Sequence, residues 1–452
     1  MVATFLDLPV EVLWLILFEV SDGSSLLSLS YLSRKTYQAY STRQKELHVS
    51  VLTRKYQEIS LDINEPIAAI RSTGLGLKEH KEEAIVVLDD WRRREETAEK
   101  VKESLCIDEI KELYKFHKEV VFFLDDFQYG TKRQPWMNFK YGIRRYDLNR
   151  LTDSERRRFT TSLCRLVTHA NIFEQNEEAK DFVPSADDNY WYEGTSQADA
   201  WCLFFGTIPP WEYEEMGCVW YYLLATWVEV TVEVFDAQMD IIPRNYKELT
   251  DEDYAELGDA TDSPFRRFTS EEFPMTPRGV LCRGGLMLGF RGTGETYCDE
   301  YSFASLGPRF LFRIMSALPL LRHKMLLSNV NPRPFTPWIG SAVDVPWSVR
   351  VPIMYPADKY NVQSFDELWS KISTTEGLSG VWRHAAERML LVSPDFKGAF
   401  AKLSDDPLNI QTEAGWNIQA FIWDMEKLEK WGHAGDWFEQ EVWREYEHPP
   451  WY

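Results

Sequence analysis

The first forty residues of the chain hold more apolar side chains than a unit of that size can bury. Apolar residues fill the segment LPVEVLWLILF at 8–18 and return as LLSL at 26–29 and as LSR at 32–34. This spacing predicts three short helices, of which the first is apolar on nearly every side and must be covered on more than one face. About forty residues cannot provide that cover alone. We therefore expect another protein to cover the surplus apolar surface.

The start of the first helix is marked by proline and by negative charge. Pro9 fits the first helical position, because the N–H that proline lacks has no helical partner there. Asp7 or Leu8 would then precede it as the cap. Asp7 and Glu11 also place negative charge near the helix N-terminus, where the helix dipole favours it.

These residues resemble the F-box, the motif through which substrate receptors of SCF-type ubiquitin ligases bind a Skp-type adaptor. The resemblance covers about residues 5–40 and rests on Leu8-Pro9, Glu11, Leu13, Ile16, Val20, the Ser24-Ser25-Leu26 turn, Leu29, Leu32 and Ser33-Arg34. Tyr37 stands where an aromatic residue is common. Thr36 departs from the pattern, since the family often carries Trp or Phe there, and the departure weakens the expected contact of the third helix. The alternative interpretation makes residues 1–40 the first helices of a larger helical domain.

The resemblance implies which residues would contact the adaptor. They are Leu8, Pro9, Glu11, Val12, Leu13, Ile16, Leu17, Val20, Leu26, Leu29, Leu32 and Tyr37. Among these, the side chains expected to enter an apolar groove of the adaptor are Leu8, Pro9, Leu13, Ile16, Leu17 and Leu29. The sequence assigns no substrate-binding residue.

Beyond this unit the chain predicts a mainly α fold with minor β content and no repeat architecture. We expect an F-box at 1–45, a linker helix at 46–62 and an α-rich body at 63–452, with a long insertion at 240–280. The body resembles those of F-box proteins of filamentous fungi. Helices are expected at 43–58, from 64, at 77–105, 107–127, 152–179, 211–239 (with a strand as the alternative at 228–234), 302–328, from 364, and at 412–431 and 436–446.

Composition narrows the class of protein. Aromatic residues make up 14% of the chain, which favours a well-filled body. The net charge of −21 argues against binding to nucleic acid or to anionic membranes, because both require a surplus of Lys and Arg. A basic n-region is missing before Leu8, and the longest apolar run, 218–228, is too short to span a bilayer. We therefore expect an intracellular protein of the cytoplasm or nucleus with reduced cysteines.

The body shows no pattern typical of catalysis. The glycine-rich stretch at 283–294 lacks the ending of a phosphate-binding loop, and the histidines and cysteines lack metal-ligand spacing. We expect no cofactor, no metal site and no catalytic residue. Aromatic clusters at 190–192, 220–222 and 437–443 could line a substrate pocket, but core packing is the more common use of such residues.

The sequence therefore predicts a non-catalytic substrate-recognition subunit of an SCF-type ubiquitin ligase. Its F-box would bind a Skp-type adaptor, and through it a cullin, while the body would hold a protein substrate. One alternative is a binding module that contacts the adaptor in a complex without ligase activity. Another is an enzyme whose site is assembled from residues distant in sequence.

Overall fold

The computed structural model describes residues 8–77, 79–129 and 151–173, and parts of 203–230, 303–326 and 422–427. This described part is mostly helical and contains no strand, which confirms a mainly α fold. Its helices are α1 (Val10–Phe18), α2 (Gly23–Ser30), α3 (Arg34–Thr42), α4 (Gln44–Glu58), α5 (Asn64–Arg71), α6 (Lys81–Arg92), α7 (Arg94–Ser104), α8 (Ile107–Tyr129), α9 (Asp153–Phe173) and α16 (Gly307–Ser316).

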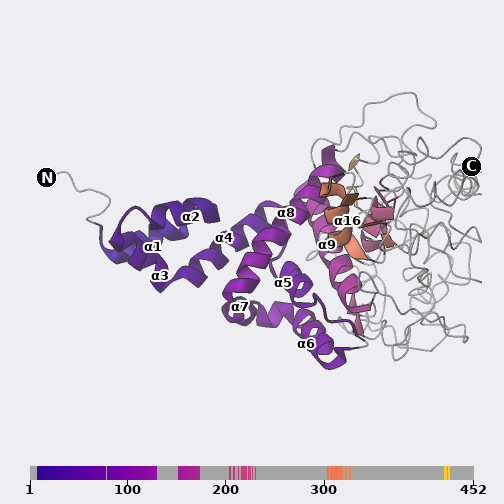
Figure 1. Ribbon diagram of the computed structural model, residues 1–452, viewed down its shortest axis with the longest axis horizontal. Coiled ribbons are helices and arrows are strands. Elements are labelled where there is room, and N and C mark those ends of the chain that lie inside the picture. The colour runs from indigo at the N-terminus through magenta and orange to yellow at the C-terminus, as the bar shows by residue number, and fades with distance from the viewer. Residues whose placement is uncertain are drawn as a thin grey trace, which may run out of the picture.

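The described helices form a small unit and a larger body (Figure 1). Helices α1, α2 and α3 lie together at one end of the molecule, and α4 leads from them to the body, where α5–α9 and α16 pack. Each part has its own apolar core. The core of the small unit consists of Leu13, Leu17, Leu26, Ala39, Tyr40, Leu47 and Val51.

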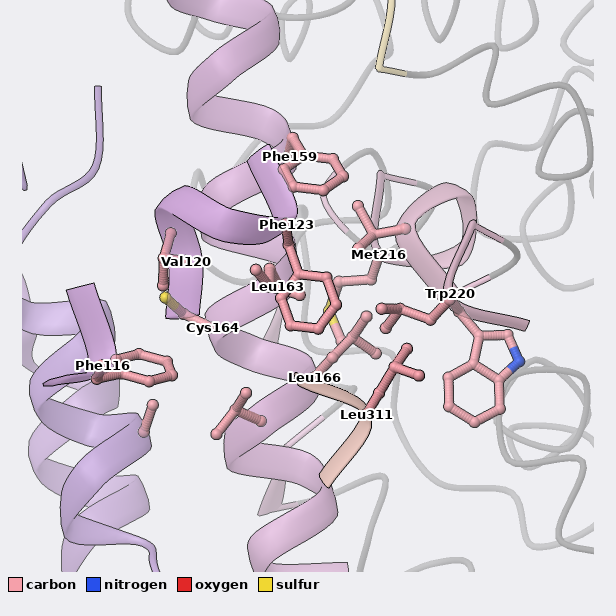
Figure 2. Packing of buried hydrophobic residues seen from close by; sticks show 14 of the residues in the cluster. Phe116, Val120, Phe123, Phe159, Leu163, Cys164, Leu166, Met216, Trp220 and Leu311 are labelled. Carbon is pink, nitrogen blue, oxygen red and sulfur yellow. The ribbon is translucent and has the colours of Figure 1, made fainter. Parts of the chain in front are cut away.

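The body is built around α8 and α9, which α5 and α16 cover. Side chains from three helices meet there, among them Phe123 of α8, Leu163 of α9 and Leu311 of α16 (Figure 2). Trp220 and Tyr222, from an aromatic cluster considered above for a substrate pocket, are buried in this core. The other two clusters, at 190–192 and 437–443, lie outside the described residues.

Several predicted helix boundaries are confirmed. Helix α5 begins at Asn64, and α9 begins with the expected capping box. The Glu155 N–H donates to the Thr152 hydroxyl at 3.2 Å, and the Thr152 N–H donates to the Glu155 carboxylate at 2.9 Å. Val230, inside the segment for which a strand was the alternative, is helical. The expected elements at 240–280, 283–294, 364–367 and 436–446 lie outside the described residues.

The single helix expected at 77–105 is wrong, because the chain divides into α6 and α7 at Arg93. At this residue the backbone leaves helical geometry, with φ −91° and ψ 15°. The buried Trp91 ring accounts for the break: it stacks on Phe204 at 5.3 Å, and its indole N–H donates to Glu65 at 2.9 Å.

Buried charges join α9 to its neighbours. The Arg165 guanidinium contacts Glu65 of α5 at 3.0 Å and Glu212 at 2.5 Å. Burial acts to raise the pKa of Glu65, but the charges of Arg165 and Arg94 outweigh it and lower that pKa. Nearer the start of α9, Arg158 lies 3.6 Å from Glu215. Here burial dominates and raises the pKa of Glu215 to about 8, which Arg158 offsets only in part.

Replacing Glu215 by Gln is expected to make the free energy of unfolding less sensitive to a rise in pH than it is in the parent chain. Below about pH 8 the native carboxyl keeps a proton that the unfolded chain releases above about pH 4.5. The free energy of unfolding contributed by this group therefore falls as the pH rises through that window, by up to about 1.4 kcal/mol per pH unit. Glutamine has nothing to release, so the stability difference between Glu215→Gln and the parent chain should increase from pH 5 to pH 8. Urea unfolding followed by tryptophan fluorescence measures this stability difference at each pH. An equal difference at pH 5 and pH 8 would contradict the raised pKa of Glu215.

Candidate docking surface

The first helix starts one residue later than the sequence indicates. Pro9 is the residue before α1, with an extended ψ of 152°, and not its first helical residue. Its carbonyl accepts hydrogen bonds from the N–H groups of Val12 and Leu13, both at 3.1 Å. The exposed proline ring thus stands at the entrance of the helix, and its missing N–H leaves no donor unsatisfied.

One face of α1 fills the core of the small unit. Leu13 and Leu17 are completely buried, and the half-buried Val10, Trp14 and Phe18 pack against the same core. Positions three and four apart fall on one side of an α-helix, so these five residues form one inward face. This face supplies the part of the core that α3 and α4 cover.

The opposite face of α1 is also apolar. Val12, Leu15 and Ile16 lie three and four positions apart and point away from the core. Leu15 is 67% exposed, while Val12 and Ile16 are half-buried. We call these three residues the outer stripe. Exposed Glu11 and Glu19 flank it, so the stripe is an apolar strip with acidic edges.

Helix α2 is positioned by an aspartate cap. The Asp22 carboxylate accepts hydrogen bonds from the Ser24 hydroxyl and from the Ser25 N–H, the latter at 2.8 Å. The bond from the Ser24 side chain is the main reason why the pKa of Asp22 lies below its usual value. Residues 24–26, expected as a turn, therefore form the first turn of a helix. This orientation places Leu26 in the core and Leu27 outside it.

A second apolar group lies on α2, on α3 and in the turn between them. Leu27, Tyr31, Leu32 and Tyr37 are each at least 40% exposed. The rings of Tyr31 and Tyr37 stack at 6.2 Å with an interplanar angle of 20°, so the turn after α2 and helix α3 present one aromatic surface. We call these four residues the aromatic patch. Tyrosine is well suited to such a surface because it offers a large contact area at low entropic cost.

Thr36, which departs from the F-box pattern, stabilises the turn between α2 and α3. Its side chain is fully buried, and its hydroxyl accepts from the Ser33 N–H at 2.9 Å. The Thr36 N–H donates in turn to the Ser33 hydroxyl at 3.1 Å, which completes a capping box at the start of α3. The Thr36 hydroxyl also lies 3.1 Å from the Ser30 carbonyl at the end of α2. The threonine fixes the α2–α3 turn by hydrogen bonds that an aromatic side chain could not make.

The structure sorts the predicted contact residues into three groups. Fully enclosed in the unit's own core, and so unable to enter a partner's groove without unfolding the unit, are Leu13, Leu17 and Leu26. Half-buried against that core are Leu8, Val20 and Leu29. At the outer surface are Pro9, Glu11, Val12, Ile16, Leu32 and Tyr37.

Leu13, Leu17 and Leu26 therefore support the unit from within, and three exposed apolar residues, Leu15, Leu27 and Tyr31, were not among the predicted contacts. Leu15 was overlooked because a helix apolar on all sides does not reveal its inward face, although its spacing from Val12 carries the signal. Leu27 of α2 and Tyr31, the residue that follows this helix, lie four positions apart, and the expectation of a turn in this region concealed that pattern.

The described residues offer no other site of clear chemistry. They contain no group of three or more His, Cys, Asp or Glu side chains able to hold a metal ion. In the same part of the chain, none of the helices combines the length and the apolar character needed to cross a membrane. Cys164 and Cys218 are buried, and burial raises the pKa of the Cys164 thiol, which makes it a poor nucleophile.

Comparison of the chain with models of protein families, with curated proteins and with solved structures finds no match. The arguments about function therefore rest on the residues and on their geometry.

The assignment of inner and outer faces predicts opposite effects for two neighbouring leucines. Leu13→Ala leaves a cavity in a small core and should cost the unit about 2–5 kcal/mol. Leu15→Ala removes an exposed side chain and should change stability by no more than about 0.5 kcal/mol. Native-state hydrogen exchange of the amides in α1–α3, measured by mass spectrometry on the full chain, distinguishes the two. Similar loss of protection in both variants would show that α1 is rotated from the orientation described.

Proposed function

We propose that α1, α2 and α3 form a docking unit for a Skp-type adaptor, and that the chain is the substrate-recognition subunit of an SCF-type ubiquitin ligase. One observation carries the proposal: the unit fills its own core and still presents the outer stripe and the aromatic patch. The resemblance of residues 5–40 to the F-box indicates that the protein bound by this unit would be a Skp-type adaptor. Several residues that carry this resemblance are not enclosed in the fold. Pro9, Leu32 and Tyr37 are exposed, and Leu8 is half-buried.

The size of the exposed groups suits a stable complex. Transferring one large apolar side chain from water into a groove stabilises a complex by about 1.5–3 kcal/mol. A few such anchors near the centre of an interface dominate its free energy, and the remaining contacts serve mainly to exclude water. Leu15 and Ile16 in the outer stripe, with stacked Tyr31 and Tyr37 in the aromatic patch, are anchors of this kind. The acidic edges at Glu11 and Glu19 would lie at the rim of the interface.

In this proposal the protein performs no bond chemistry. It holds a substrate on its body and raises the concentration of a target lysine near the conjugating enzyme that the ligase recruits. The partners are therefore the adaptor, through it a cullin, and a protein substrate. The buried positions of Trp220 and Tyr222 place these two residues in the core, so recognition of a substrate would use other side chains.

The first experiment compares two exposed leucines. Leu15 and Leu318 are 67% and 78% exposed, but Leu15 belongs to the outer stripe and Leu318 follows α16 on the body. Leu15→Ser should weaken binding of the full chain to a purified Skp-type adaptor at least tenfold, because a polar hydroxyl replaces an apolar anchor. Leu318→Ser, as the matched control, should bind like the parent chain. Calorimetry or surface plasmon resonance measures both affinities, and equal affinities would reject the docking surface.

A second experiment separates ligase function from adaptor binding alone. The full chain is mixed with adaptor, cullin and RING subunit, and assembly is followed by size-exclusion chromatography with a ubiquitin discharge assay. Assembly into a complex that accelerates discharge supports the proposed receptor. A stable pair with the adaptor that excludes the cullin would favour a binding module outside the ligase instead.

A further inference from the structure

The small unit and the body share one helix. Leu47 and Val51 of α4 belong to the core of the unit, while Leu52 and Tyr56 of the same helix belong to the core of the body. Since α4 runs without a break from Gln44 to Glu58, the two cores are joined by a continuous helix and not by a loop. Continuity of the backbone alone does not fix how the other helices of the unit lean against the body. Side chains must do that.

Three polar side chains meet at the place where the unit touches the body. The Tyr40 hydroxyl of α3 lies 3.0 Å from His48 Nε2, and His48 Nδ1 lies 3.0 Å from the Tyr114 hydroxyl. The ring of His48 meets both tyrosine rings edge to face, at 5.9 Å and 5.7 Å. The chain of contacts thus runs from α3 of the unit, through the shared α4, to α8 of the body.

The protonation of these groups suits a directed chain of hydrogen bonds. Burial lowers the pKa of His48, so its ring is neutral at pH 7 and carries one donor and one acceptor nitrogen. Burial likewise raises the pKa values of Tyr40 and Tyr114, and both keep their hydroxyl protons. One tyrosine can therefore donate to the ring while the other accepts from it. Both nitrogens of a neutral histidine are satisfied by this arrangement.

Tyr114 makes a further contact that ties α2 to the body. Among the described residues, Tyr114 is half-buried and packs against both apolar cores. A Cβ atom at Gly23, the first residue of α2, would lie only 3.0 Å from the Tyr114 hydroxyl oxygen. Glycine therefore lets the end of α2 rest on the Tyr114 ring. The side chain of Tyr114 touches the unit through α2 and α4 while its backbone belongs to α8.

A second tie lies on the α1 side of the same helix. The Arg54 guanidinium of α4 donates to the Val20 carbonyl, just beyond α1, at 2.6 Å and lies 3.8 Å from the Glu19 carboxylate. Two residues further along α4, the Tyr56 hydroxyl donates to the carbonyl of Leu113, the residue before Tyr114, at 2.8 Å. The unit is thus held to α4 on two sides, and α4 is held to α8 directly beside Tyr114.

We infer that Tyr40, His48 and Tyr114 form a joint that holds the three-helix unit at one orientation to the body, with Tyr114 as the positioning residue. This joint stands on contacts within the chain and does not depend on which partner binds the docking unit. It involves the core side of the unit, whereas the outer stripe lies on the opposite face of α1.

The test measures distance in the free full-length chain. Probes are attached through genetically encoded azide-bearing residues at Ser41 on α3 and Asp125 on α8, both exposed, because native Cys106 is also exposed and would react with thiol labels. Pulsed electron spin resonance then gives the distribution of distances between the unit and the body. The parent chain should give one narrow distribution.

Tyr114→Phe keeps the ring and removes the hydroxyl that contacts His48. Loss of this one partly buried hydrogen bond should raise the population of other orientations about fivefold and broaden the distribution. Tyr31→Phe, which removes an exposed hydroxyl of the same unit, should leave the distribution unchanged. Where circular dichroism shows that Tyr114→Phe lowers helix content, Gly23→Ala decides instead, because its methyl group pushes against the same ring. A parent-like narrow distribution in the folded joint variant would overturn the inference.

Discussion

Helix geometry in a small core determines the character of the N-terminal unit. Three short helices and the start of α4 can enclose one row of large side chains from α1, and Leu13 and Leu17 occupy it completely. Because successive residues of a helix point 100° apart, an apolar sequence without interruption must also place leucine and isoleucine on the far side. Leu15 and Ile16 are therefore exposed as a direct result of a filled core. The apolar surplus seen in the sequence becomes a surface with a definite position.

The same filled core explains how the unit can be joined to a larger body. A unit with a complete core of its own can keep its shape while it shares only one helix with its neighbour. Helix α4 contributes to both cores. Its Leu47 and Val51 lie in the core of the unit, and its Leu52 and Tyr56 lie in the core of the body. The polar contacts of His48 lie near the unit's half of this helix. Polar groups suit that position, since hydrogen bonds have directions and apolar contacts do not.

Local sequence patterns allowed most of the helices to be predicted. The features that could not be predicted depend on contacts between residues distant in the chain. The capping box of Thr152 and Glu155 joins residues three apart, and the start of α5 at Asn64 is marked by Pro66 two residues later, so the sequence reveals both. The division between α6 and α7 depends on Trp91 meeting Phe204 and Glu65, which are distant in the chain. The exposed apolar surface of the small unit shows the same limit. The sequence indicates an apolar surplus in the first forty residues, but which leucines face outward depends on how α3 and α4 cover α1.

The outer stripe and the joint occupy different sides of the same unit, whereas Tyr37 of the aromatic patch lies beside Tyr40 of the joint, with ring centroids 6.5 Å apart. Tyr114 reaches the unit on its core side, near Gly23 and His48. The outer stripe lies on the face of α1 turned away from that core, so a partner bound there would leave the joint in place. An adaptor held by Leu15 and its neighbours would then carry the body at the orientation that Tyr114 sets. In the proposed complex, the outer stripe would contribute affinity for the partner, while Tyr114 would set the direction in which the body points.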